Sequence, residues 1–134
     1  MLQGTESQIL AFEARYFAEV TNQDLGTKDL EFSFERVKPI PQEFQPPSEG
    51  WYDWCIENWG TKWDVCHFIR QDDEPGTYFF DTAWAFPQAL FDELASQLEN
   101  DFPGLYFEGY FIETGVGYSG NFYYNDQDGF ECHS

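Results

Sequence analysis

The chain is poor in positive charge. Its 134 residues include 6 Lys or Arg against 25 Asp or Glu, which gives a formal net charge of −19. No Lys or Arg lies beyond Arg70, whereas 13 acids do. This deficit excludes direct binding to a nucleic-acid backbone or to an anionic membrane, because both contacts need basic residues. It favours a cationic partner; the alternative is that the acids serve solubility alone or a salt-rich habitat.

Cysteines and long apolar runs are also scarce. Cys55, Cys66 and Cys132 are odd in number and not densely spaced, which predicts free thiols rather than a secreted disulfide scaffold. No stretch approaches the roughly 20 apolar residues of a membrane-spanning helix. The N-terminus lacks the basic region and apolar run of a signal peptide. We therefore expect a cytoplasmic protein.

Aromatic residues are abundant, at 21% of the chain. Such density excludes a disordered protein, and the length fits one domain. Apolar spacing and turn residues then predict the secondary structure. The predicted elements are a helix over 6–21, a strand over 30–35, a loop over 38–50, a short helix or turn over 51–59, strands over 63–70 and 78–84, a helix between Pro87 and Phe102, and strands over 105–113 and 116–124. This order predicts an α+β fold, one antiparallel sheet with two helices on one face.

Several segments resemble the YubB-type ferredoxin-like family of plasmid and phage proteins. The most specific is the run Asn58, Trp59, Gly60, Thr61, Lys62 and Trp63. Residues 34–44, 82–87 and 113–120 are similar to three further family segments. The resemblance implies one ferredoxin-like domain over 1–134, with a Pro- and Trp-rich insertion over 37–62 and an acidic tail over 125–134. It also implies a mobile element in a bacterial host, but no reaction, since the family has no agreed biochemical function.

The start of the chain departs from that family. Only Met1, Leu2 and Gln3 precede Gly4, where the family usually has a full first strand. We therefore expect the first edge strand to be truncated or missing. An open sheet edge would allow a homodimer, or strand addition by a partner.

Two groups of residues suggest chemistry without specifying it. The Trp-rich run over 51–63 fits either core packing or an aromatic platform for a cationic group. Two Cys-His pairs, Cys66-His67 and Cys132-His133, invite a metal. Adjacent strand residues point to opposite faces, so Cys66 and His67 cannot share an ion unless the strand has a bulge. We expect no metal and no cofactor.

No catalytic motif is present, and nothing in the sequence positions a Cys–His nucleophile pair, so we expect a non-enzymatic protein. The remaining candidates are acids on helices and turns, which can present an anionic surface comparable to that of DNA. They are Asp72, Asp73, Glu74, Asp92, Glu93, Glu99, Asp101, Glu108 and Glu113.

These acids suggest an inhibitor or decoy, of anti-CRISPR or anti-restriction type. Its partner would be the basic nucleic-acid-binding surface of a host defence complex. The alternative is a structural or scaffolding module that binds partners through an aromatic face or the open sheet edge.

Overall fold

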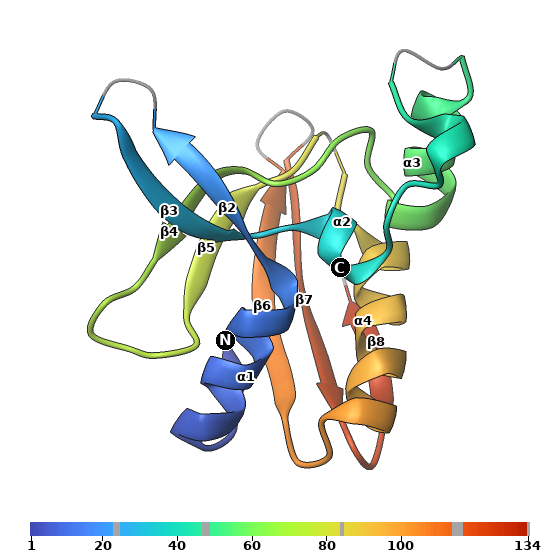
Figure 1. Cartoon of the computed structure of the whole chain (residues 1–134). Coiled ribbons are helices and arrows are strands. Elements are labelled where there is room, and N and C mark those ends of the chain that lie inside the picture. Colours follow the sequence, from blue (N-terminus) through green and yellow to red (C-terminus); the bar gives the residue numbers. More distant parts are fainter. Residues whose placement is uncertain (23–24, 47–48, 84, 114–116, 134) are drawn as a thin grey trace.

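The computed structural model describes residues 1–22, 25–46, 49–83, 85–113 and 117–133. The fold is a mixture of α-helices and antiparallel sheets, as expected (Figure 1). The helices are α1 (Glu6–Tyr16), α2 (Phe34–Val37), α3 (Trp51–Trp59) and α4 (Gln88–Asp101), with a 3-10 turn η1 (Gln42–Phe44). Among the described residues, none of the helices has the length and apolar composition that crossing a membrane requires.

The main sheet has four strands in the order β1-β6-β7-β8, and each pair of neighbours is antiparallel. Its strands are β1 (Leu2–Gln3), β6 (Tyr106–Glu113), β7 (Tyr118–Asn125) and β8 (Gly129–His133). The two-residue β1 is the expected stub of a first strand. The prediction of a single sheet is wrong, because two hairpins form sheets of their own. These are β2 (Phe17–Asn22) with β3 (Thr27–Phe32), and β4 (Cys66–Arg70) with β5 (Tyr78–Asp81).

Helices α1 and α4 frame the core. The Phe91 ring of α4 packs against Phe107 of β6 and Phe122 of β7, with centroid separations of 5.6 and 4.8 Å. The Tyr16 hydroxyl at the end of α1 donates to Gln97 of α4 at 2.9 Å. Figure 1 shows the two helices flanking the sheet, with α4 alongside β8.

Two glycines on the buried side of the main sheet make room for phenylalanine rings. Phe122 lies directly across from Gly109, and Phe111 directly across from Gly120. A Cβ on Gly109 would lie 2.5 Å from the Phe122 ring, and one on Gly120 would lie 2.5 Å from the Phe111 ring. Each ring therefore covers the glycine opposite it.

The predicted helix over 6–21 is wrong in its last turn. The helix ends at Tyr16, and Phe17 is extended, with φ −99° and ψ 142°. From Phe17 the chain pairs with β3 over the whole length of β2, and Phe17 lies opposite Phe32. Both rings are buried in the core, so tertiary pairing overrides the helical spacing.

The predicted strand over 30–35 is shifted. β3 begins at Thr27 and ends at Phe32, and Phe34 opens the short helix α2. The alternation of Leu30, Phe32 and Phe34 with polar residues predicts one shared buried face, yet Leu30 is 52% exposed, whereas Phe34 is fully buried.

A bulge alters the predicted strand over 63–70. His67 has a positive φ of 52°, and the register shifts between Cys66 and Ile69. The extra residue turns Phe68 towards the core and leaves Ile69 58% exposed, so the regular alternation of the sequence over 63–70 does not continue through the strand.

The C-terminal segment 125–134 is not an acidic tail over its described length. It forms β8, which pairs with β7 from Asn125↔Gly129 to Asn121↔His133. Phe130 packs against the core, which attaches this strand to the body of the domain. Four features of the predictions lie outside the described residues: Pro47, Trp84, the turn Thr114–Gly115 and Val116.

Candidate functional site

The signature segment Asn58–Trp63 is mainly a folding feature. The Trp59 side chain is 2% exposed, and its indole N–H donates to the carbonyl oxygen of Lys38 at 3.0 Å. Its ring meets those of Phe34 and Trp54 edge to face. The fully buried Thr61 hydroxyl donates to the Trp63 carbonyl at 3.0 Å. These contacts fit core packing, the first of the two interpretations of this run.

Gly60 forms a corner in the chain at the end of α3, where this helix lies against the start of α4. It ends α3 with a left-handed φ of 85°, which favours glycine. A Cβ there would lie 3.2 Å from the backbone nitrogen of Gln88, the first residue of α4. Beyond the corner, the Lys62 ammonium stands 4.8 Å from the Trp63 ring, which is 42% exposed. Of the signature residues, Trp63 is therefore the one that offers an aromatic surface to solvent.

Asp64 has a role that the sequence does not reveal. Its carboxylate accepts hydrogen bonds from the backbone N–H groups of Phe34 and Val65, both at 2.7 Å, and from the Ser33 hydroxyl at 2.9 Å. A weaker contact from the Glu35 N–H measures 3.4 Å. The carboxylate thus satisfies the donors that open α2 and ties that helix to the segment before β4. The sequence around Asp64 does not indicate that its carboxylate binds the start of α2, because Phe34 lies thirty residues earlier in the chain.

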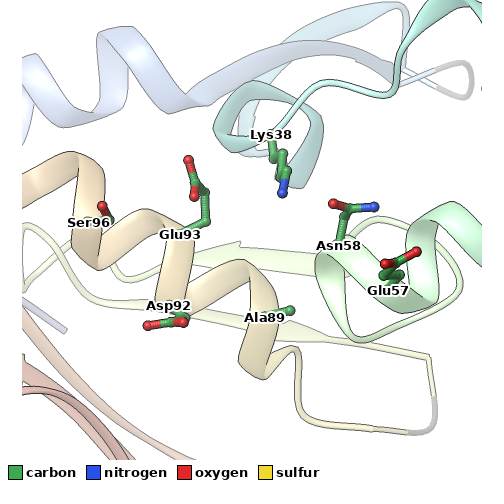
Figure 2. Close-up of a pocket in the computed structure, with 7 residues that line it drawn as sticks. All are labelled: Lys38, Glu57, Asn58, Ala89, Asp92, Glu93 and Ser96. Atoms are coloured by element: carbon green, nitrogen blue, oxygen red, sulfur yellow. The ribbon is translucent and has the colours of Figure 1, made fainter.

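A shallow polar pocket of about 430 Å³ lies between α2, α3 and α4. Figure 2 shows Lys38 entering from the end of α2, between Glu93 on α4 and Asn58 on α3. Glu57, Asp92, Ala89 and Ser96 complete the lining. The Glu93 carboxylate also accepts a hydrogen bond from Gln97 at 3.0 Å. Because the lining has three carboxylates and one ammonium, the pocket is suited to a second cationic group.

The nine candidate acids do not form one surface. Asp92 and Glu93 line the pocket, but Asp72, Asp73 and Glu74 lie in the β4–β5 turn, on the opposite side of the molecule from α4 (Figure 1). The other four lie on α4 and β6: Glu99, Asp101, Glu108 and Glu113. The structure therefore distributes the negative charge over several sides.

The basic residues are largely engaged within the protein. The structure describes all six, and three pair with acids: Arg15 with Asp101, Lys28 with Glu19, and Arg70 with Glu13. The Glu13 carboxylate also accepts a hydrogen bond from the Tyr78 hydroxyl, which links α1 to β5. The ion pair with Arg15 makes the Asp101 carboxylate less available to a partner.

The thiols and histidines show little sign of a reactive centre. Burial, with a smaller contribution from the charges of Asp64 and Glu35, raises the pKa of Cys55 to about 11, so its thiol stays protonated at neutral pH. Despite the bulge, the His67 imidazole lies against Asp81, at 2.8 Å. Within the described part of the chain, no three His, Cys, Asp or Glu side chains gather in a way that could hold a metal ion.

The comparisons with known proteins concern the second half of the chain. Residues 58–134 match the family described as "Ferredoxin-like domain in Api92-like protein". Searches of curated proteins and of solved structures found no match. The match begins at Asn58, so it contains the whole signature segment, α4 and strands β4 to β8. It confirms the ferredoxin-like part of the predicted resemblance, and the chain belongs to the family of ferredoxin-like domains in Api92-like proteins.

Proposed function

We propose that the protein is a non-enzymatic acidic binding protein whose partner presents a basic surface. The observation that carries this proposal is the charge imbalance of the folded molecule. The chain has six Lys and Arg against 25 Asp and Glu, and within its described residues Arg15, Lys28 and Arg70 are already in ion pairs with acids. A field of this size speeds the approach of a positively charged partner and repels nucleic acid.

The finer proposal is that this chain is itself a YubB-type protein of a phage or mobile element and acts as an inhibitor or decoy, of anti-CRISPR or anti-restriction type, against a host defence protein. A defence nuclease or CRISPR effector holds nucleic acid in a basic channel, and a compact anionic domain competes for that channel. The distribution of the acids suggests attraction from several sides. The pocket that contains Asp92 and Glu93 can receive a Lys or Arg side chain of the partner.

The test is a competition assay against a panel of purified restriction enzymes and CRISPR effectors carrying labelled DNA. The protein should displace DNA from at least one of them. The displacement should weaken steeply between about 50 and about 200 mM NaCl, as charge-driven contacts do. A natural partner that binds equally well across this range would refute the proposal.

Two charge-reversed variants locate the contact. Asp92→Lys with Glu93→Lys changes the pocket, and Asp72→Lys with Asp73→Lys changes the β4–β5 turn by the same net charge. A greater loss of competition in the first variant would place the contact at the pocket. An equal loss in both would indicate the long-range field alone.

A second candidate function is an interaction module that binds through apolar surface. Tyr110 and Ile112 on β6 are 86% and 76% exposed, which favours such a contact. Salt separates the two candidates, because an apolar interface is not weakened by added NaCl.

A further inference from the structure

The main sheet has one face that helices do not cover. Alternation along the strands places Phe107, Phe122 and Tyr124 on the core side, so their neighbours point the other way. We call this opposite side the outer sheet face. Its residues are Glu108, Tyr110 and Ile112 on β6, Ser119, Asn121 and Tyr123 on β7, and Glu131 and His133 on β8.

The outer sheet face carries an unusual apolar feature. A solvated sheet face normally alternates to polar residues, yet Tyr110 and Ile112 project here with 86% and 76% of their surface exposed. A shallow groove of about 480 Å³ runs beside them, with Ser119, Gly120 and Asn121 among its lining residues. His133 on β8 also borders it. The small side chains of β7 leave room between Tyr110 and β8 for an apolar group.

The surroundings of the groove are uniformly acidic. The segment 106–133, which includes β6, β7 and β8, contains five Asp or Glu and no Lys or Arg. Glu108 lies in the same cross-strand row as Tyr123 and Glu131. Hydrogen bonds from Tyr123 and His133 hold the pKa of Glu131 below its ordinary value, so this carboxylate is ionised at neutral pH.

We propose that the outer sheet face docks a segment of a partner protein in which an aliphatic or aromatic anchor is flanked by Lys or Arg. The anchor lies in the groove against Tyr110 and Ile112, and the flanking cations pair with Glu108 and Glu131. This inference rests on the proposed function and names the surface and the partner chemistry. Charge complementarity selects this occupant, because the outer sheet face has the carboxylates of Glu108 and Glu131 and no Lys or Arg side chain.

The same charges disfavour two other occupants. A nucleic-acid strand stacking on Tyr110 would need Lys or Arg along its path, and this face has none. A second copy of the chain would bring two acidic sheets together, which like-charge repulsion opposes.

The test uses three fluorescein-labelled synthetic peptides and anisotropy at low salt. The first has a Leu-Phe anchor with Lys and Arg on both sides. The second keeps the basic residues but replaces the anchor with Ser-Ser, and the third keeps the anchor but has Glu on both sides. The first should bind most tightly, and amide NMR shifts should map it to β6, β7 and β8.

The variants Tyr110→Thr and Ile112→Thr remove the apolar contact while keeping a residue suited to a strand. Each should weaken binding of the first peptide about tenfold, the loss expected when a large apolar contact is removed. Ile69→Thr is the matched control, since Ile69 is also an exposed strand residue, at 58%, but lies on β4. Glu108→Gln should weaken binding several-fold, whereas Glu99→Gln on α4 should not.

The outcomes separate this inference from the proposed function. If the second peptide binds as tightly as the first, or if Ile112→Thr and Ile69→Thr behave alike, the outer sheet face is not the docking site and only the acidic field remains. If no basic peptide binds, both ideas fail. If the first peptide binds at β6–β8 but high salt does not weaken its binding, the docking surface is supported and the charge-driven function is refuted.

Two further measurements can overturn the choice of occupant. A dimer in sedimentation that Ile112→Thr abolishes would assign this face to a second copy. Binding of an oligo-thymidine strand that Tyr110→Thr abolishes would assign it to nucleic acid.

Discussion

Removing the Asp64 carboxylate should destabilise the fold more than removing any exposed acid. In the variant Asp64→Ala the N–H groups of Phe34 and Val65 lose acceptors that lie 2.7 Å away, and the Ser33 hydroxyl loses one at 2.9 Å. Hydrogen bonds to a charged group contribute about 1.5–3 kcal/mol each, and part of that is regained from water after the change. We expect a loss of about 3 kcal/mol, a large fraction of the roughly 5–15 kcal/mol that stabilises a domain.

Asp64→Asn gives a graded comparison. The remaining carbonyl oxygen can still accept from Phe34 and Val65, but the new NH₂ group meets the Glu35 N–H. We expect the free energy of unfolding to fall by about 1 kcal/mol, since the hydrogen bond from the Ser33 hydroxyl changes and the charge is removed. The change also weakens the interaction of the carboxylate with the N-terminus of α2.

Urea unfolding followed by Trp fluorescence measures both losses, because Trp59 is packed in the core. The controls are Asp72→Ala and Asp72→Asn, which remove the same charge from the exposed β4–β5 turn and should change stability by less than about 0.5 kcal/mol. If Asp64→Ala unfolds at the same urea concentration as Asp72→Ala, the carboxylate does not hold α2 and the reasoning fails.

Three other predictions follow from the same contacts. Gly120→Ala should lower the free energy of unfolding by about 1–3 kcal/mol, because its Cβ would lie 2.2 Å from the carbonyl oxygen of His133 and 2.5 Å from the Phe111 ring. The control Ser119→Ala should be nearly neutral in the same urea assay. In a variant with Cys66→Ser and Cys132→Ser, Cys55 should react with a disulfide reagent at neutral pH only as fast as the protein unfolds, since its pKa is about 11; rapid labelling of the folded protein would contradict its burial. Burial raises the pKa of Tyr16 from 10.0 to about 12. The stabilisation from its protonated hydroxyl should therefore be complete below pH 10 and lost as the pH rises from 10 to 12. Unfolding measured as a function of pH should show a smaller loss of stability over this range in Tyr16→Phe.

Several elements could be predicted from the sequence because neighbouring residues specify them. Helix α3 ends at Gly60, whose positive φ suits glycine, and α4 carries the predicted stripe of Leu90, Phe91, Leu94 and Leu98, all buried. The capping box of Thr5 and Gln8 opens α1 as expected. In each case the decisive residues lie within a few positions of one another.

The errors occurred where local spacing allowed more than one structure. Phe17 and Val20 fit the helical period of α1, yet pairing with β3 across the hairpin makes that segment a strand. The alternation over 63–70 is regular, but the bulge at His67 changes which side chains face the core. Strand β8 begins at Gly129, which has a positive φ of 69°, and the strand contains too few apolar residues for an alternating pattern to predict it.

The sequence alone determined the strongly negative charge, the aromatic core and the free thiols, because these depend on composition. It also predicted that the Trp-rich run could serve as core. Only the tertiary structure decided that Asp64 caps α2, that Asp92 and Glu93 share a pocket with Asn58, and that Tyr110 and Ile112 stand on an uncovered sheet face. The first two features join residues about 30 to 35 positions apart, and the third depends on which face of the sheet the helices cover. Such contacts are set by how the elements pack, which no local pattern of residues encodes.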